Sequence, residues 1–374
     1  MRSLSKFLVS KKKFQKNLNA LSSYVSSGNH QLIPMVKAEA YGHGMFAIAD
    51  WIIELTSANE INGFGVATII EGMALRKNLE IWDGEIYIFS ECDLINKKEI
   101  YIDFGLTPIL SQVSDLEFFL QNKMQLQLPM AIKLNTGMNR LGFQVDEMPV
   151  VINLLKKHNV FSIDLLLTHY AHSFDSKTDS IQEQQQIFIQ LKQMIEVAGI
   201  ECKKVSLSNS GAIEHRASLP SEVLRPGLML YGIKNLEAID SSFDLKCISA
   251  LETIPLSLKR LNKGEKFGYG LTELIESGFL LLLPLGYADG MKLGFTGIQL
   301  EIEGVNCQIV GRINMDITYL FSTDVRIQKF MGKKIRLWSF EQDQINHFAK
   351  KAHSIPYDIL TSISSRVPRD YLIE

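Results

Sequence analysis

A regular alternation of short apolar runs with helical patterns over about the first 230 residues constrains the fold most. Helical patterns are clearest at 115–119, 148–157 and 182–197, and another helix is expected over 10–25 with Ser10 as its cap. Strands that alternate with helices form parallel sheets, and eight of them suggest a (β/α)8 barrel of the TIM type. A doubly wound sheet has the same periodicity, so the pattern alone leaves both folds open. The apolar runs predict strands at residues 32–36, 63–66, 85–89, 106–110, 129–134, 163–168, 204–207 and 223–230.

The pattern changes after Gly232, where helical patterns nearly vanish and turn signals separate short β-like runs. A chain of 374 residues is long for one domain and comfortable for two. We therefore predict a barrel domain at residues 1–234 and a mostly-β domain at residues 235–374. The β-like runs of the second domain lie at 247–258, 279–285, 298–302, 308–310, 317–321 and 334–338.

Composition excludes several classes of function. The net charge is −2 and no basic block is longer than residues 11–13, so nucleic acid is not expected as a partner. The longest apolar run, residues 279–285, is too short to cross a membrane. The four cysteines form no Cys-x-x-Cys pair, so neither a disulfide framework nor a metal site is expected. The first residues contain no long apolar stretch typical of a secretory signal, which favours the cytoplasm.

Lys37 is the first candidate functional residue. It follows the apolar run at 32–36, and a glycine-flanked loop after it leads into a helical pattern that begins near Met45. The carboxyl end of a strand is where parallel α/β proteins bind ligands. An amine in a dry pocket there can form a Schiff base, whereas the ordinary alternative is a lysine that reaches from the strand end to solvent.

Other reactive residues lie at or near the ends of predicted strands, and Arg225 lies within the eighth. Each has an ordinary structural explanation when it is taken alone. Their common position is more informative, because catalytic groups of barrels come from several strand ends. These residues are Lys133, Arg140, His169, Ser210 and Arg225.

Several motifs resemble those of alanine racemases, which use pyridoxal 5'-phosphate (PLP), and they occur in that family's order and spacing. A set of this kind is far more specific than any single motif. The resemblance implies an N-terminal PLP barrel followed by a β domain, in agreement with the change of pattern after Gly232. The motifs are Val36-Lys-Ala-Glu-Ala-Tyr-Gly-His-Gly44, Thr136-Gly-Met-Asn-Arg-Leu-Gly142, Ser208-Asn-Ser210, Leu224-Arg-Pro-Gly-Leu-Met-Leu-Tyr-Gly232, Gly268-Tyr-Gly270, Gly286-Tyr-Ala-Asp-Gly290, Gly311-Arg-Ile-Asn-Met-Asp316 and the segment from Ile355 to Arg369.

The resemblance also implies roles in holding the cofactor. Lys37 would carry PLP as a Schiff base, and Arg225 would face the pyridine nitrogen. An arginine is always protonated, so it keeps that nitrogen unprotonated and weakens the cofactor as an electron sink. The phosphate would be held by Tyr41, Ser210, Tyr357 and the backbone amides of Gly227 and Leu228, and amides near a helix start suit a dianion.

Racemisation needs two bases, because one base tends to return the proton to the face it came from. The resemblance implies Lys37 on one face and Tyr269 on the other, with His169 hydrogen-bonded to Tyr269. In the family this tyrosine comes from the partner subunit, so a homodimer with shared sites is expected. The substrate carboxylate would be bound by Arg140 and the Met315 backbone, and Lys133 matches a position that is carbamylated in some members.

Two positions depart from the family pattern. Many members carry an acidic residue and an arginine that pair in the entry corridor, and here these positions are Phe174 and Leu293. We therefore expect an alanine racemase that supplies D-alanine for peptidoglycan, with less certain selectivity for alanine. A broad-specificity racemase on the same fold is the alternative. A PLP decarboxylase would need an acid in place of Arg225, and a non-catalytic PLP carrier would lack the second domain.

Overall fold

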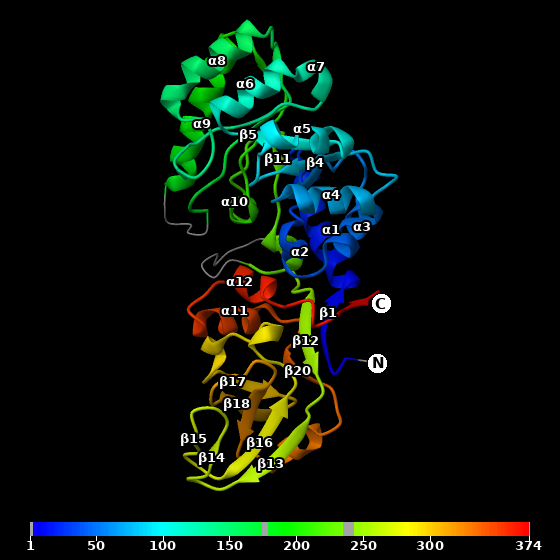
Figure 1. Ribbon diagram of the computed structural model, residues 1–374, viewed down its shortest axis with the longest axis vertical. Coiled ribbons are helices and arrows are strands. Elements are labelled where there is room, and N and C mark those ends of the chain that lie inside the picture. The colour runs from blue at the N-terminus through cyan, green and yellow to red at the C-terminus, as the bar shows by residue number, and fades with distance from the viewer. Residues whose placement is uncertain (1–2, 174–178, 235–242, 374) are drawn as a thin grey trace.

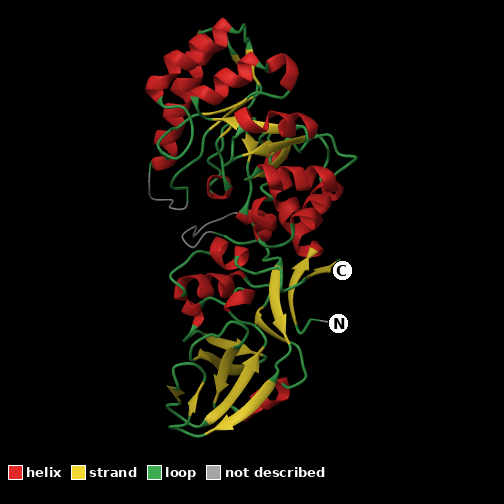
Figure 2. Cartoon of the chain, in the orientation of Figure 1, coloured by secondary structure: helices red, strands yellow, loops and turns green. Residues whose placement is uncertain are grey.

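A computed structural model of the chain describes residues 3–173, 179–234 and 243–373. Figure 1 shows an elongated molecule with a helix-rich part at one end and a sheet-rich part at the other. The same division is visible by secondary structure in Figure 2. Phe174 lies outside the described residues, as do residues 235–242, where the predicted domain boundary falls.

Eight parallel strands close into a barrel in the first part. Six of them form one sheet in the order β10-β8-β6-β5-β4-β3, and β11 pairs with β2. A bridge between Met35 and Gly65 joins β2 to β3, and a bridge between Asn209 and Arg225 joins the ends of β10 and β11. The predicted barrel is confirmed, because a doubly wound sheet would stay open. The strands are β2 (Gln31–Leu32), β3 (Gly63–Val66), β4 (Glu85–Ile88), β5 (Leu106–Leu110), β6 (Ala131–Lys133), β8 (Leu165–Leu167), β10 (Val205–Ser206) and β11 (Val223–Leu224).

The barrel helices form for reasons that the sequence shows. Ser10 caps α1 by accepting a hydrogen bond from the Lys13 amide, as predicted, and the buried face of α1 carries apolar residues at helical spacing. The other predicted helices are also present within a few residues of their expected ends. The helices are α1 (Lys11–Ser27), α2 (Lys37–Tyr41), α3 (Met45–Leu55), α4 (Ile69–Asn78), α5 (Leu94–Asp103), α6 (Val113–Gln121), α7 (Lys123–Leu126), α8 (Met148–Lys157), α9 (Ser180–Val197) and α10 (Ser210–Glu214). A short strand pair, β7 (Ser162–Ile163) with β9 (Glu201–Cys202), adds to the barrel part.

The first and eighth predicted barrel strands end several residues too late. The eighth ends at Leu224 instead of residue 230, because Pro226 has no amide hydrogen for a ladder and the chain then forms a 3-10 helix, Leu228–Tyr231. The first, predicted at 32–36, is reduced to β2, and beyond Pro34 only the bridge at Met35 continues the pairing. Both strands therefore end early, and the chain that follows each of them has irregular backbone at the barrel mouth.

The second part contains a five-stranded antiparallel sheet in the order β13-β16-β19-β18-β17 and a small hairpin, β14-β15. The predicted strand at 247–258 is wrong as one element, since it divides into β12 and β13 on either side of Pro255. The expectation that helices nearly vanish is also wrong, because α11 buries a narrow stripe of Ile345, Phe348 and Ala349 on an otherwise polar helix. The elements are β12 (Ser249–Thr253), β13 (Ser257–Leu261), β14 (Lys266–Phe267), β15 (Thr272–Glu273), β16 (Gly278–Leu283), β17 (Gln299–Ile302), β18 (Val305–Val310), β19 (Thr318–Ser322), β20 (Ile335–Trp338), α11 (Gln342–Lys351), α12 (Pro356–Thr361) and β21 (Arg369–Leu372).

The first strand of the chain, β1 (Ser5–Ser10), belongs to a sheet of later residues. It lies between β12 and β21 in the four-stranded order β20-β12-β1-β21. Its residues Phe7 and Val9 are fully buried, and the sequence reading had not assigned this strand. The N-terminus therefore crosses from the sheet-rich part into the barrel, whereas the division of the chain at residues 234 and 235 stays a prediction.

Within the described residues, no helix is long and apolar enough to span a membrane. The same residues contain no group of three or more histidine, cysteine or acidic side chains that could hold a metal ion. All four cysteines are free thiols.

Candidate active site

Lys37 lies where the chain leaves β2 at the barrel mouth. Burial lowers the pKa of its amine, and the positive charges of Arg140 and Arg225 lower it further, while Glu71 partly opposes them. A neutral amine is the form that attacks a carbonyl, so the site favours the reactive state of Lys37.

An unusual turn follows Lys37. Ala38, Glu39, Ala40 and Tyr41 all have left-handed backbone angles, with φ between 50° and 56°. Each such non-glycine residue costs about 1–2 kcal/mol, so the four together cost roughly 4–8 kcal/mol. Surrounding contacts must therefore impose the turn, and it directs Tyr41 back toward the barrel mouth.

Arg225 is anchored below the mouth. Its side chain is only 3% exposed, and its guanidinium donates to the carbonyl oxygens of Thr168 (2.6 Å) and Leu207 (3.0 Å) and to the Ser206 hydroxyl. Burial lowers its pKa to about 10, with nearby Glu222 acting in the opposite direction. Arg225 therefore stays cationic at neutral pH in a fixed orientation.

Lys133 and His169 complete a group of basic side chains around Lys37. Lys133 is 5% exposed, and burial together with Arg225 and Arg140 lowers its pKa to about 8. The pKa of His169 lies well below its usual value, first through burial and then through the same cations. His169 is thus neutral at pH 7 and can both donate and accept a hydrogen bond.

A second group of predicted residues forms a polar cradle beside the first. The Ser210 hydroxyl accepts hydrogen bonds from the amides of Gly227 (2.9 Å) and Met229 (3.4 Å). A side chain on Gly227 would place its Cβ 2.5 Å from the Tyr41 hydroxyl oxygen, so only glycine permits this approach. The ring of Tyr357 from α12 lies 5.7 Å from that of Tyr41. Leu228 begins the 3-10 helix that follows Gly227.

Arg140 stands on a loop that Asn135 organises. The Asn135 side chain accepts from the amides of Gly137 (3.1 Å) and Asn139 (2.9 Å), which is a compact Asx-type arrangement. A side chain on Gly142 would collide with the backbone at residue 134, so the loop must close with glycine. Arg140 itself is exposed and makes no hydrogen bond or ion pair within the described part of the chain. The sequence reading missed the role of Asn135, although an asparagine that precedes a glycine turn was its signal.

Tyr269 and Met315 lie apart from these groups. Tyr269 is 69% exposed at the tip of the β14-β15 hairpin, at the end of the molecule away from α2 (Figure 1). Its neighbour Gly268 packs on Tyr319, whose hydroxyl accepts a hydrogen bond from Asn314, next to Met315. Within one chain the hairpin that contains Tyr269 therefore lies near the loop of Met315 and well away from α2, which begins at Lys37 (Figure 1). Leu293 is also exposed on this part.

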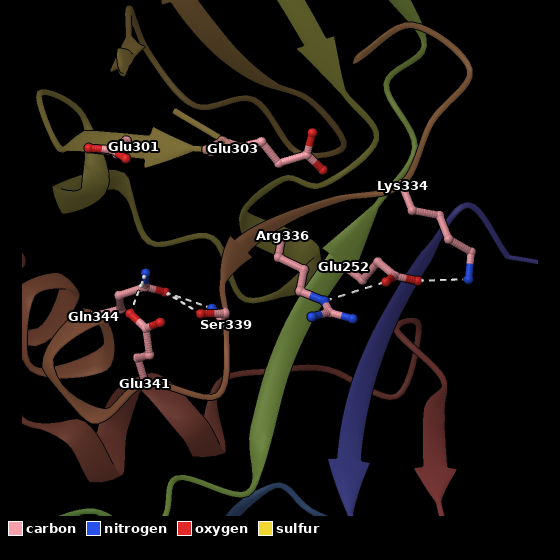
Figure 3. A pocket seen from close by; sticks show the side chains of 9 residues that line it. Glu252, Glu301, Glu303, Lys334, Arg336, Ser339, Glu341 and Gln344 are labelled. Atoms are coloured by element: carbon pink, nitrogen blue, oxygen red, sulfur yellow. Dashed lines mark hydrogen bonds and ion pairs between the residues drawn. The ribbon is translucent and has the colours of Figure 1, made fainter. Parts of the chain in front are cut away.

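A polar cavity of about 750 Å³ in the sheet-rich part contains none of the predicted site residues. Figure 3 shows its lining, in which the buried Glu252 is paired with Lys334 (3.0 Å) and Arg336 (3.6 Å). Both of its cations pair with Glu252, and three further glutamates, Glu301, Glu303 and Glu341, also line it. Because it contains none of the predicted reactive residues, the candidate chemistry remains at the barrel mouth.

Comparison with known proteins decides the family. The model of the alanine racemase N-terminal domain matches residues 9–235, and that of the C-terminal domain matches residues 248–371. The chain belongs to the alanine racemase family. The alanine racemase of Ligilactobacillus salivarius is 29% identical over 354 residues, which cover 91% of each chain. That of Wigglesworthia glossinidia brevipalpis is 28% identical over 361 residues, with 94% of each chain covered.

Solved structures agree with this assignment. The alanine racemase of Acinetobacter baumannii is 26% identical and superposes with a TM-score of 0.81 over 99% of this chain and 100% of that one. The alanine racemase of Bartonella henselae, described with covalently bound pyridoxal phosphate, shares the fold with a TM-score of 0.86 at 24% identity, over 99% of this chain and all of that one. The chain is a PLP-dependent isomerase that interconverts L- and D-alanine, and the broad-specificity alternative is not favoured.

The residues present fit the cofactor. Lys37 provides an amine of lowered pKa, and Arg225 provides a buried cation. The space next to the Tyr41 hydroxyl, which a Cβ on Gly227 would fill, lies beside the Ser210 hydroxyl and backbone amides that suit a phosphate. Membership of the alanine racemase family confirms PLP as the predicted cofactor, and the residues of the site are consistent with it.

Proposed function

We propose that the chain racemises alanine as a head-to-tail homodimer, in which Lys37 of one subunit and Tyr269 of the partner subunit act on opposite faces of the substrate. The observation that carries this proposal is the separation of the β14-β15 hairpin, which contains Tyr269, from α2, which begins at Lys37 (Figure 1), together with the 69% exposure of Tyr269. A catalytic base needs a site from which water is largely excluded, and a tyrosine on an exposed hairpin obtains one only when another surface covers it.

The roles of the residues follow from their surroundings. When bound, PLP withdraws electrons from the α-carbon of alanine and makes its proton acidic. Lys37 and Tyr269 of the partner subunit each remove or return that proton on their own face. Arg225 would lie toward the pyridine nitrogen of bound PLP and, as a permanent cation, would keep that nitrogen unprotonated. The phosphate would be held by Tyr41, Ser210, Tyr357 and the amides of Gly227 and Leu228.

Arg140 and the backbone of Met315 bind the substrate carboxylate, since a guanidinium gives a charge-assisted hydrogen bond. His169 hydrogen-bonds Tyr269 of the partner subunit and assists its ionisation. Lys133 is carbamylated and orients Arg140. We further propose that the enzyme works in the cytoplasm and supplies D-alanine for peptidoglycan, which is supported by its bacterial relatives.

Mixing two inactive variants tests the shared site. Lys37→Ala and Tyr269→Phe should each lose deuterium exchange with inversion of L-alanine in deuterated water. In a heterodimer of the two, one site keeps both native bases. An equal mixture after subunit exchange should therefore recover roughly a quarter of wild-type activity, as expected for two symmetry-related sites. No recovery, with heterodimers present, would contradict a site shared between subunits.

Selectivity is measured in the same assay with L-serine and L-lysine as substrates. We expect L-alanine to be preferred. Rapid inversion of the larger substrates would instead favour the broad-specificity alternative.

A further inference from the structure

The turn after Lys37 contains a buried histidine that the reaction does not use. His43 has no exposed surface, and its ring stacks on Tyr231 with centroids 4.6 Å apart. Its Nδ1 lies 2.9 Å from the carbonyl oxygen of Ala40, within the left-handed turn, and its Nε2 lies 3.1 Å from the Ser249 hydroxyl on β12. Since a carbonyl only accepts, Nδ1 carries the hydrogen and Nε2 accepts from Ser249.

Arg369, at the start of β21, holds the same turn from another direction. Its guanidinium donates to the carbonyl oxygen of Gly42 (2.9 Å) at the end of the turn. Its other nitrogens donate to the carbonyl oxygens of Ser364, Val367 and Ile363, at 2.7, 3.0 and 2.7 Å. Arg369 therefore ties the segment after α12 to the turn through four hydrogen bonds.

Close packing leaves the turn little freedom. A Cβ on Gly42 would lie 2.3 Å from the carbonyl oxygen of Leu360 in α12, and one on Gly44 would lie 2.0 Å from the Tyr371 hydroxyl. The turn is therefore clamped between the barrel and the C-terminal segment. That contact also brings Tyr357 of α12 beside Tyr41.

We propose that His43 and Arg369 are positioning residues, which hold the left-handed turn so that the Tyr41 hydroxyl stays beside Gly227 in the phosphate cradle. This inference rests on the proposed role of Lys37 and Tyr41 in holding PLP. Neither residue touches the reacting atoms. They act through the backbone of residues 40 and 42, and they couple the cradle to the sheet that contains β1, β12 and β21.

Three variants separate positioning from general stability. His43→Phe keeps an aromatic ring against Tyr231 but removes both hydrogen bonds, and Arg369→Lys keeps the charge but cannot reach four carbonyls. His43→Gln should restore part of the function, because its amide can both donate and accept. The matched control is Lys6→Met, which removes the Lys6–Asp370 ion pair between β1 and β21 without touching the turn.

The first measurement is hydrogen exchange of the PLP-free protein. In His43→Phe and Arg369→Lys, the amides of residues 38–44 should exchange roughly fivefold faster or more, about the factor that one hydrogen bond contributes. Peptides from β16 to β19 should be unchanged, and Lys6→Met should match the wild type throughout. Equal acceleration everywhere, or none in the turn, would overturn the inference.

The second measurement is the dissociation of PLP, followed by visible absorbance. Both variants should release PLP several-fold faster than wild type with little change in the KM for alanine, and His43→Gln should lie between. If wild type itself takes up no PLP at Lys37, the proposed function fails, whereas the exchange experiment still decides whether the turn is held as described. Normal PLP release from both variants would leave the proposed function intact and refute the positioning role.

Discussion

Lys133 provides a test of how the buried cations shape the chemistry. Carbamylation joins carbon dioxide to a neutral amine, so its extent depends on the unprotonated fraction. With a pKa of about 8, roughly a tenth of Lys133 is neutral at pH 7. For an exposed lysine with a pKa of about 10.4, the neutral fraction is some 200-fold smaller. Carbamylation also replaces a cation by an anion, which relieves repulsion from Arg225, Arg140 and Lys37.

The assay is carbon NMR of the protein in ¹³C-bicarbonate. We expect one protein-bound carbamate signal that Lys133→Met abolishes. Lys203→Met is the control, because Lys203 is exposed and its ion pair with Asp164 raises its pKa. Loss of the orienting anion should also lower kcat/KM for alanine by about tenfold to a hundredfold, the value of a hydrogen bond to a charged group. A wild type without a carbamate signal, or a signal that persists in Lys133→Met, would refute the reasoning.

Three further results are expected. Gly227→Ala should weaken PLP binding by at least tenfold, because the new Cβ would lie 2.5 Å from the Tyr41 hydroxyl. A titration of the PLP-free protein with PLP measures the affinity, and an unchanged affinity would contradict the proposed phosphate cradle. Burial lowers the pKa of His43 to about 4, so its contribution to stability is complete above pH 6.5, falls as the pH drops from 6.5 towards 4, and is lost below 4. Between pH 7 and 4.5 the wild type should thus lose about 2–3 kcal/mol more unfolding free energy than His43→Phe, and equal losses in urea titrations would disprove this. Arg225→Met should cost about 1–3 kcal/mol or more in the same titrations, since it leaves the buried carbonyl oxygens of Thr168 and Leu207 without the guanidinium donor, and an unchanged stability would contradict this.

The sequence predicted the barrel well because its strands are short, apolar and separated by helices of clear periodicity. The prediction was wrong where a single residue interrupts an apolar pattern or where an element has few apolar residues. The run at 223–230 is apolar throughout, yet Pro226 ends the strand. The helix α11 is polar apart from three buried residues, so it has no apolar run of the kind by which the other elements were predicted. β1 was missed because its partners, β12 and β21, lie about 240 and 360 residues away in the chain.

Some properties of the site could likewise be predicted from the sequence, and others could not. Position near strand ends drew attention to Lys37, Lys133, His169 and Arg225 together, because every strand of a parallel barrel delivers its end to the same mouth, and the family motifs then assigned their roles. Their lowered pKa values were not visible in the sequence. They depend on how completely each side chain is buried and on how near the other cations lie.

The sequence by itself determined which residues can do the chemistry, because the identity of an amine, a phenol or a guanidinium and its place on a strand are local properties. Only the tertiary structure decided how they are held. The left-handed turn that places Tyr41 is unfavourable locally, and it exists because Arg369 and His43 tie it to strands far along the chain. The separation of Tyr269 from Lys37 is likewise a property of the assembled fold, since no local pattern records the distance between two domains.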